Sequence, residues 1–112
     1  MTHVDRKPPL LSEMFPQLSE ELQELITSAG EPGLAAQVPQ LKILDRCRCG
    51  DDFCATFYTQ PKPVGRYGPG LRTIALEPKE GMLILDVVDG VVAKIEVLYR
   101  DDIRQKLLAT FI

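Results

Sequence analysis

The sequence lacks the long apolar runs and the surplus of positive charge on which several common functions depend. No stretch approaches the roughly 20 consecutive apolar residues that a membrane-spanning helix needs, and residues 1–15 contain no apolar segment of the secretory-signal kind. The formal net charge of -3 argues against a nucleic-acid-binding protein that relies on overall positive charge. We therefore expect a protein with neither a membrane nor a nucleic acid as its partner.

Histidine is almost absent, because His3 is the only one in the chain. A cysteine or serine nucleophile is usually activated by a neighbouring base, most often histidine. His3 lies in residues 1–11, which carry two prolines and several charges and which we expect to form a loose arm. The sequence therefore predicts no catalytic residue and favours a non-enzymatic protein.

Cysteine is also scarce, and all three cysteines lie in the segment CRCGDDFC, residues 47–54. A small and odd number of cysteines disfavours a disulfide scaffold and favours a reducing compartment, so we expect a cytoplasmic protein. The simplest interpretation is that the thiols pack as small apolar groups and need no cofactor. Zinc binding or thiol redox chemistry at Cys47, Cys49 and Cys54 is the alternative.

A zinc site would depend on how the three thiols are arranged and on a further ligand. The spacing C-x-C-x4-C lacks the paired C-x2-C knuckles that make a zinc prediction strong. His3, Asp51 and Asp52 are the candidates for the fourth ligand. Because side chains alternate along a strand, Cys47 and Cys49 would share a face of a hairpin, and Cys54 on the partner strand could lie opposite one of them.

The sequence that remains has the average composition of a globular domain, with 45% hydrophobic and 26% charged residues. A chain of 112 residues fits a single domain, residues 1–112. Leucines and isoleucines at helical spacing predict an amphipathic helix over residues 17–30, with Ser19 as its N-cap. The tail, residues 101–110, predicts a short C-terminal helix.

Residues 41–99 carry the alternating and β-branched patterns of about five antiparallel strands in two hairpins. Strands 41–49 and 53–59 would form the first hairpin, around a Gly-Asp-Asp turn. The fold class that we expect is α+β, with the N-terminal amphipathic helix packed on one face of the sheet and the short helix at the C-terminus.

The second hairpin is MLILDVV–DG–VVAKIEVL, in which Asp89-Gly90 forms a favoured two-residue type I′ turn. This turn predicts that Val88 pairs with Val91 and that Ile84 pairs with Ile95, on an apolar face.

Asp86 interrupts that apolar face, where an unpaired carboxylate is costly. Arg72, Arg100, backbone amides or a different register would resolve the conflict. Catalytic use of Asp86 with Arg72 or Tyr67 in a cleft is a weaker alternative.

The longest irregular segment is QPKPVGRYGPG, residues 60–70, with cationic and aromatic groups around its prolines and glycines. It matches no phosphate-binding motif, so a connecting loop is the simplest interpretation. Binding of an anion or a peptide is the alternative. The candidate ligand-binding residues in and around this loop are Tyr58, Lys62, Arg66, Tyr67, Arg72 and Asp86.

The run DRCRCGDDFCATFYTQPKPVGRYGPG, followed by GMLILDVVDGVVAKIEVLYRDDIRQKL, resembles a family of small uncharacterised bacterial proteins. These proteins share a C-x-C-G turn followed by a strand, and a C-terminal hairpin of the form D-V-x-D-G-x-[IV]-x-x-[IL]-E-V-L. The resemblance covers roughly residues 15–108. Many relatives have a further cysteine where this chain has Asp51, which weakens a metal interpretation carried over from them. The resemblance implies a bacterial cytoplasmic protein and transfers no catalytic residue.

The leading functional hypothesis is therefore a non-enzymatic domain that works by binding or by assembly. Hairpin edges and the apolar run MLILDVVDGVV favour self-association through a sheet edge or a hairpin. The second hypothesis is a zinc-binding or thiol-redox protein that uses the three cysteines.

Overall fold

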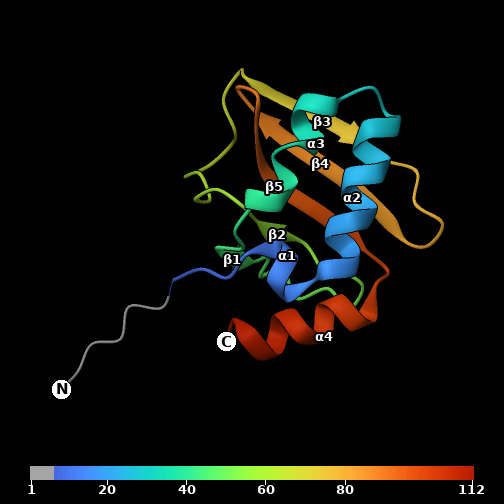
Figure 1. The fold of residues 1–112 in the computed structure, drawn as a ribbon. Helices are drawn as coiled ribbons and strands as arrows, with labels where there is room; N and C mark the ends of the chain where they lie inside the picture. The colour runs from blue at the N-terminus through green and yellow to red at the C-terminus, as the bar shows by residue number, and fades with distance from the viewer. Residues whose placement is uncertain (1–6) are drawn as a thin grey trace.

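The computed structural model describes residues 7–112 and shows an α+β fold, as the sequence predicts (Figure 1). One antiparallel sheet has the strand order β1-β2-β5-β4-β3. Its strands are β1 (Asp45–Arg46), β2 (Phe57–Tyr58), β3 (Leu71–Ala75), β4 (Met82–Val88) and β5 (Val91–Leu98). The helices are α1 (Leu11–Met14), α2 (Pro16–Ser28), α3 (Pro32–Ala35), the 3-10 turn η1 (Val38–Gln40) and α4 (Asp101–Thr110). Within residues 7–112, every helix is too short or too polar to cross a membrane.

The main helix, α2, begins earlier than the sequence predicts. Pro16 occupies its first turn, where the missing N–H of proline costs no hydrogen bond. Ser19 is consequently an interior residue, 2% exposed, and not the N-cap. Leu18, Leu22 and Ile26 are buried at helical spacing and belong to the core that α2 forms with the sheet.

The expected loose arm, residues 1–11, differs from the structure at its C-terminal end. Leu11 is fully buried, and its N–H donates to the carbonyl of Leu41 at 2.8 Å. Ile43 donates in the same way to Pro9 at 2.9 Å. Burial of apolar Leu11 therefore ties this segment to the core. Residues 1–6, including His3, lie outside the described residues.

The first hairpin is present but shorter than predicted. β1 and β2 pair antiparallel, with Asp45 opposite Tyr58 and Arg46 opposite Phe57. The predicted strand 41–49 is interrupted because residues 41–43 bond to the N-terminal segment, with Lys42 bridged to Leu10. The predicted strand 53–59 is interrupted because Cys54 pairs with Leu98 of β5, outside the regular ladder.

The second hairpin has the predicted turn but a different register. Val88 pairs with Val91, as expected for the Asp89-Gly90 turn. A β-bulge then shifts the pairing between Asp86 and Val87, so that Ile84 lies opposite Glu96 and not Ile95. The extra residue is Ala93 of β5, which has no partner in the ladder. The core face of β4 consists of Leu83, Leu85 and Val87, and Asp86 lies on the opposite face.

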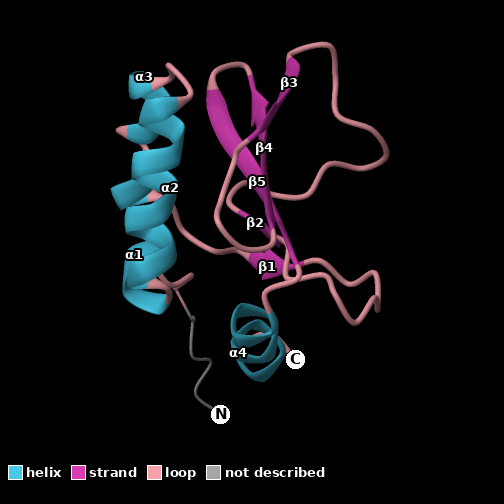
Figure 2. Ribbon diagram, turned by 90° about the vertical axis from the view of Figure 1, so that its right-hand side faces the viewer, coloured by secondary structure: helices cyan, strands magenta, loops and turns pink. Residues whose placement is uncertain are grey.

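The two faces of the sheet are therefore different (Figure 2). Helices α1 to α3 lie along one face, while the long connection between β2 and β3 lies on the opposite side. Helix α4 lies at one end of the sheet, where Arg100 forms an ion pair with Glu21 of α2 at 2.6 Å. Side chains on the face of the sheet without helices, and in the turns beside it, are therefore the ones that a ligand can reach.

Candidate metal centre

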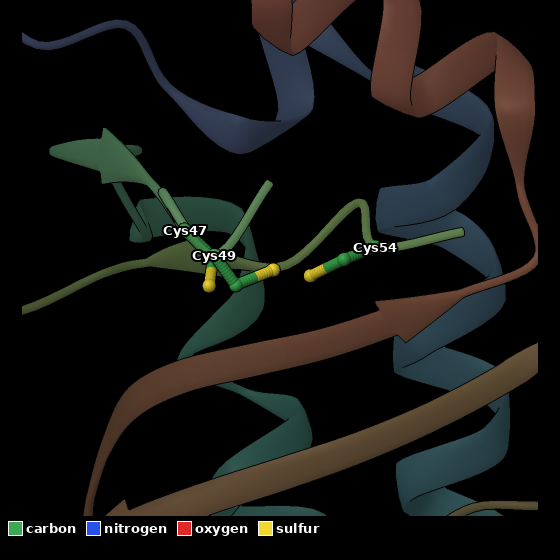
Figure 3. Close-up of side chains that lie close together, drawn as sticks. All are labelled: Cys47, Cys49 and Cys54. Carbon is green, nitrogen blue, oxygen red and sulfur yellow. The ribbon is translucent and has the colours of Figure 1, made fainter. Parts of the chain in front are cut away.

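The three cysteines converge beside the β1–β2 hairpin (Figure 3). Cys47 and Cys49 follow β1 in the chain, and Cys54 precedes β2. Their Sγ atoms all lie within 4.8 Å of one another, and all three are free thiols. The sequence pattern was compatible with such a contact but did not require it. We call these three cysteines the thiol cluster.

The burial of the thiol cluster does not suit the simplest interpretation of the sequence, that of plain apolar packing. Cys47 and Cys54 are partly buried, but Cys49 is exposed. A thiol that packs as a small apolar group is normally buried completely. The cluster therefore has two sulfurs anchored in the protein and one at the surface, where a metal ion can enter.

Hydrogen bonds in the cluster separate the acidities of its thiols. Burial raises the pKa of Cys54, but hydrogen bonds from the Thr56 hydroxyl and N–H, together with the neighbouring sulfurs, outweigh burial and lower the pKa below its usual value. The N–H of Asp51 lowers the pKa of Cys49, but burial and the other two sulfurs raise it to about 11. Cys54 therefore loses its proton before Cys49 does.

Thr56 holds Cys54 in position, because both its hydroxyl and its N–H form hydrogen bonds with the Cys54 sulfur. Its hydroxyl also accepts a hydrogen bond from the N–H of Val97 at 3.1 Å, and Ala55 donates to the Val97 carbonyl at 2.8 Å. These bonds join the chain around Cys54 to β5, in the interior of the sheet. One sulfur is thereby held on a rigid element, which lowers the conformational cost of binding a ligand there.

The donor set fits a soft metal ion with three protein ligands. A tetrahedral zinc site with Zn–S bonds of about 2.3 Å places its sulfur atoms about 3.8 Å apart. The three Sγ atoms lie within 4.8 Å of one another, which is close to this separation. Asp51 and Asp52, the fourth ligands suggested by the sequence, do not belong to the cluster, and His3 lies outside the described residues.

A row of polar residues crosses the helix-free face next to the thiol cluster. The register places one residue on each strand, in direct line across the sheet: Asp45, Tyr58, Lys94, Asp86 and Thr73. Residues in register on adjacent strands share a face and contact one another. The row therefore connects the hairpin that carries the cysteines to the far edge of the sheet.

Asp86 is the centre of this row, and its surroundings differ from those the sequence suggests. The Thr73 hydroxyl donates a hydrogen bond to Asp86 Oδ1 at 3.1 Å, and Lys94 Nζ lies 3.4 Å from Oδ2. Arg72 and Arg100, the predicted partners, instead pair with Glu31 and Glu21. Arg72 lies opposite Val87 and therefore on the other face of the sheet from Asp86. The bulge places Lys94 of β5 directly opposite Asp86.

Lys94 and Glu96 are site residues that the sequence reasoning missed. Glu96 follows Lys94 on the same face of β5, and burial followed by contact with Asp86 raises the pKa of its carboxyl group. Burial lowers the pKa of Lys94, but Asp86 and Glu96 outweigh burial and raise it. The only signal in the sequence was Asp86 itself, as a charge that the assumed register left without a partner.

The structure gathers four of the six candidate ligand-binding residues around one pocket. Tyr58, Lys62, Arg66 and Tyr67 line it together with Lys94. Asp86 lies behind Lys94 and does not line the pocket. Arg72 lies elsewhere, because its guanidinium group forms two hydrogen bonds with Glu31, at 2.8 and 3.1 Å. The catalytic alternative needs Asp86 in a cleft with Arg72 or Tyr67. The side chain of Asp86 is only 4% exposed, and neither Asp86 nor Arg72 lines the pocket that contains Tyr67.

No protein-family model, curated protein or solved structure matches this chain.

Proposed function

We propose that this protein is a non-enzymatic binding protein whose thiol cluster holds one zinc ion. The observation that carries the proposal is the convergence of Cys47, Cys49 and Cys54 to within 4.8 Å, with one thiol at the surface. Three protein ligands leave the fourth position of a tetrahedral ion open to water or to a small ligand.

The chemistry of the three donors supports zinc. Thiolates are soft ligands and select zinc, copper(I) and related ions over magnesium or calcium. Since each ligand binds as the thiolate, loading the site releases protons. Three thiolates and one Zn²⁺ have a net charge of -1. Because Cys49 is exposed, water can solvate this charge. The free thiols also support the proposed cytoplasmic location, because reducing conditions preserve them.

The test is metal analysis of the full chain, purified without chelator under reducing conditions. We expect one zinc per chain, and we expect Co²⁺ substitution to produce the sulfur-to-cobalt charge-transfer absorption of a thiolate site. Each of C47S, C49S and C54S removes one ligand of three, so each variant is expected to lose most of the zinc. Zinc-free protein that also fails to take up Co²⁺ contradicts the proposal.

The matched control is the double variant D51N/D52N, which changes two acidic residues in the same turn without touching a sulfur. We expect it to retain one zinc. Loss of zinc from this control would show that a carboxylate is a ligand and that the three-sulfur site is wrong. A thiol-redox function predicts a different result, in which the protein is metal-free and mild oxidation consumes two of the three thiols.

A second candidate function is self-association through β3. This strand lies at the edge of the sheet, and four of its five residues are exposed. An exposed edge offers unpaired backbone groups to a second copy of the chain. We expect a molar mass by light scattering that rises toward that of a dimer with concentration, and we expect Ala75→Pro, at an exposed position of β3, to abolish the rise. A mass that stays monomeric at high concentration removes this candidate.

A further inference from the structure

The connection between β2 and β3 forms a second candidate site, separate from the thiol cluster. It passes over the helix-free face of the sheet (Figure 2) and borders an open pocket of about 400 Å³. Six lining residues matter for its chemistry, and we call the site the loop pocket: Tyr58, Lys62, Arg66, Tyr67, Leu71 and Lys94. A volume of this size suits a small molecule and not a folded partner.

Positive charge collects in the loop pocket although the whole chain is acidic. Residues 59–72 contain two arginines and one lysine but no aspartate or glutamate. Arg72 is paired with Glu31, and Lys94 is paired with Asp86. Within residues 7–112, Lys62 and Arg66 form no ion pair. Two cations are therefore available to an anionic ligand.

Aromatic rings form the walls between these cations. Lys62 Nζ lies 5.8 Å from the centroid of the Tyr58 ring, and Lys94 Nζ lies 5.8 Å from the ring centroids of both Tyr58 and Tyr67. Leu71 adds an apolar surface that is 40% exposed. Two aromatic rings beside an apolar side chain favour a ligand with a flat apolar group.

Tyr67 supplies a further, unused donor. Its hydroxyl oxygen is buried and forms no hydrogen bond within the described part of the chain. A buried hydroxyl without a partner is costly, and a ligand oxygen would satisfy it. Two prolines, Pro63 and Pro69, restrict the backbone on either side and reduce the ordering that binding requires.

We infer that the loop pocket binds a small aromatic anion, with Lys62 and Arg66 on its phosphate or carboxylate group and Tyr58 and Tyr67 against its ring. The inference does not depend on zinc, because no lining residue is a cysteine. The anion lies at the mouth of the pocket, where Lys62 and Arg66 are exposed. The ring lies against the sheet, over the row that Tyr58 and Lys94 share.

Calorimetric titration of the full chain with three probes separates the parts of this inference. Phenyl phosphate presents both the ring and the anion, inorganic phosphate presents the anion alone, and phenol presents the ring alone. We expect saturable one-to-one binding of phenyl phosphate, weaker binding of phosphate and none of phenol. Raising the ionic strength is expected to weaken the binding of phenyl phosphate. Chelator-treated and zinc-loaded samples should both bind it.

The decisive variant is K62Q/R66Q, which removes the two available cations at exposed positions and should leave the fold intact. Loss of two charge-assisted contacts is expected to weaken phenyl phosphate binding by at least about tenfold. The matched control is K42Q/K79Q, which removes two exposed cations outside the pocket and should change the affinity less than twofold. Equal weakening in both variants, or no saturable binding by either anion, overturns the inference. Inorganic phosphate that binds as tightly as phenyl phosphate overturns its aromatic part.

Discussion

At the residue scale, Asp86 is the clearest case of a side chain whose role depends on one neighbour. A buried carboxylate without a cation would destabilise the fold strongly. The Lys94 ammonium group and the Thr73 hydroxyl together provide the compensation, at 3.4 and 3.1 Å. Glu96 adds a second carboxyl group beside Asp86, and its burial and its contact with Asp86 raise its pKa.

The raised pKa of Glu96 gives a pH-dependent prediction. Burial and contact with Asp86 raise this pKa, so the folded protein keeps the Glu96 proton at pH values where the unfolded chain has lost it. Between the ordinary pKa of glutamate and the raised one, the folded state binds more protons. The contribution of Glu96 to the free energy of unfolding therefore decreases as the pH rises through this window.

Glu96→Gln removes this titration and keeps the shape of the protonated side chain. We expect urea denaturation to show that E96Q gains stability relative to the unmodified protein as the pH rises from about 4 to about 7. Glu20→Gln makes the same change at an exposed position of α2, and its stability difference should be independent of pH. Parallel pH profiles for E96Q and the unmodified protein would show that the pKa of Glu96 is not raised in the folded protein.

At the scale of the elements, the bend before β4 depends on a residue without a side chain. Gly81 has a φ of 68°, in the left-handed region, and a Cβ atom there would lie 2.5 Å from the carbonyl oxygen of Leu98. The same Cβ would approach the side chain of Arg100, whose Nε donates to the Glu80 carbonyl at 2.9 Å. The close contact is between the residue that precedes β4 and the end of β5, so one substitution disturbs the start of one strand and the end of the other.

We therefore expect Gly81→Ala to lower the free energy of unfolding by about 1–3 kcal/mol, measured by urea denaturation. Gly33→Ala is the matched control, because Gly33 lies in α3 and a Cβ there meets nothing within 4 Å. That control should be neutral or stabilising by up to about 1 kcal/mol. Equal effects of the two substitutions would count against the contact between Gly81 and Leu98.

The elements that the sequence predicted correctly are those specified by neighbouring residues. The Asp89-Gly90 turn needs two positive φ angles, which the structure has at 50° and 80°. The spacing of Leu18, Leu22 and Ile26 likewise specifies the buried side of α2. Local pattern was sufficient in both cases, although the position of Pro16 and not of Ser19 decided where the helix begins.

The features that the sequence did not predict depend on long-range pairing. Alternation along β5 has no marker for the bulge, so the predicted register put Asp86 on the apolar face and left Lys94 and Glu96 out of the site. The thiol cluster was more accessible to prediction, because its members lie within eight residues and a turn brings them together. The distances between the sulfurs could not be predicted, because they depend on the long-range pairing of Cys54 with Leu98.

At the scale of the whole molecule, the sheet separates stability from binding. The helices cover one face and complete the core, while the thiol cluster, the polar row and the loop pocket lie along the opposite face and its adjoining turn. Tyr58 connects the polar row to the loop pocket, because it belongs to the row and lines the pocket. Burial and the nearby Cys47 raise its pKa, against the opposing effect of Lys94.

This arrangement predicts that zinc stabilises the folded chain as a whole. Cys47 and Cys49 follow β1, while Cys54 is paired with β5, so the three sulfurs meet only when the sheet is formed. Arg46 extends the connection to the C-terminal region, because its Nε donates to the Phe111 carbonyl at 2.6 Å. A ligand that binds only the folded state adds up to about 2.7 kcal/mol when its free concentration is 100 times Kd.

We expect the urea midpoint of the unmodified protein to be higher in zinc-buffered solution than in chelator, by an amount that grows with free zinc. D51N/D52N should show the same increase, because it retains all three sulfurs. C54S should show none, since it loses the ligand that Thr56 and β5 hold in place. An equal increase in C54S would mean that zinc acts elsewhere on the chain, and the absence of any increase in the unmodified protein would mean that the sulfurs do not form a site in the folded state.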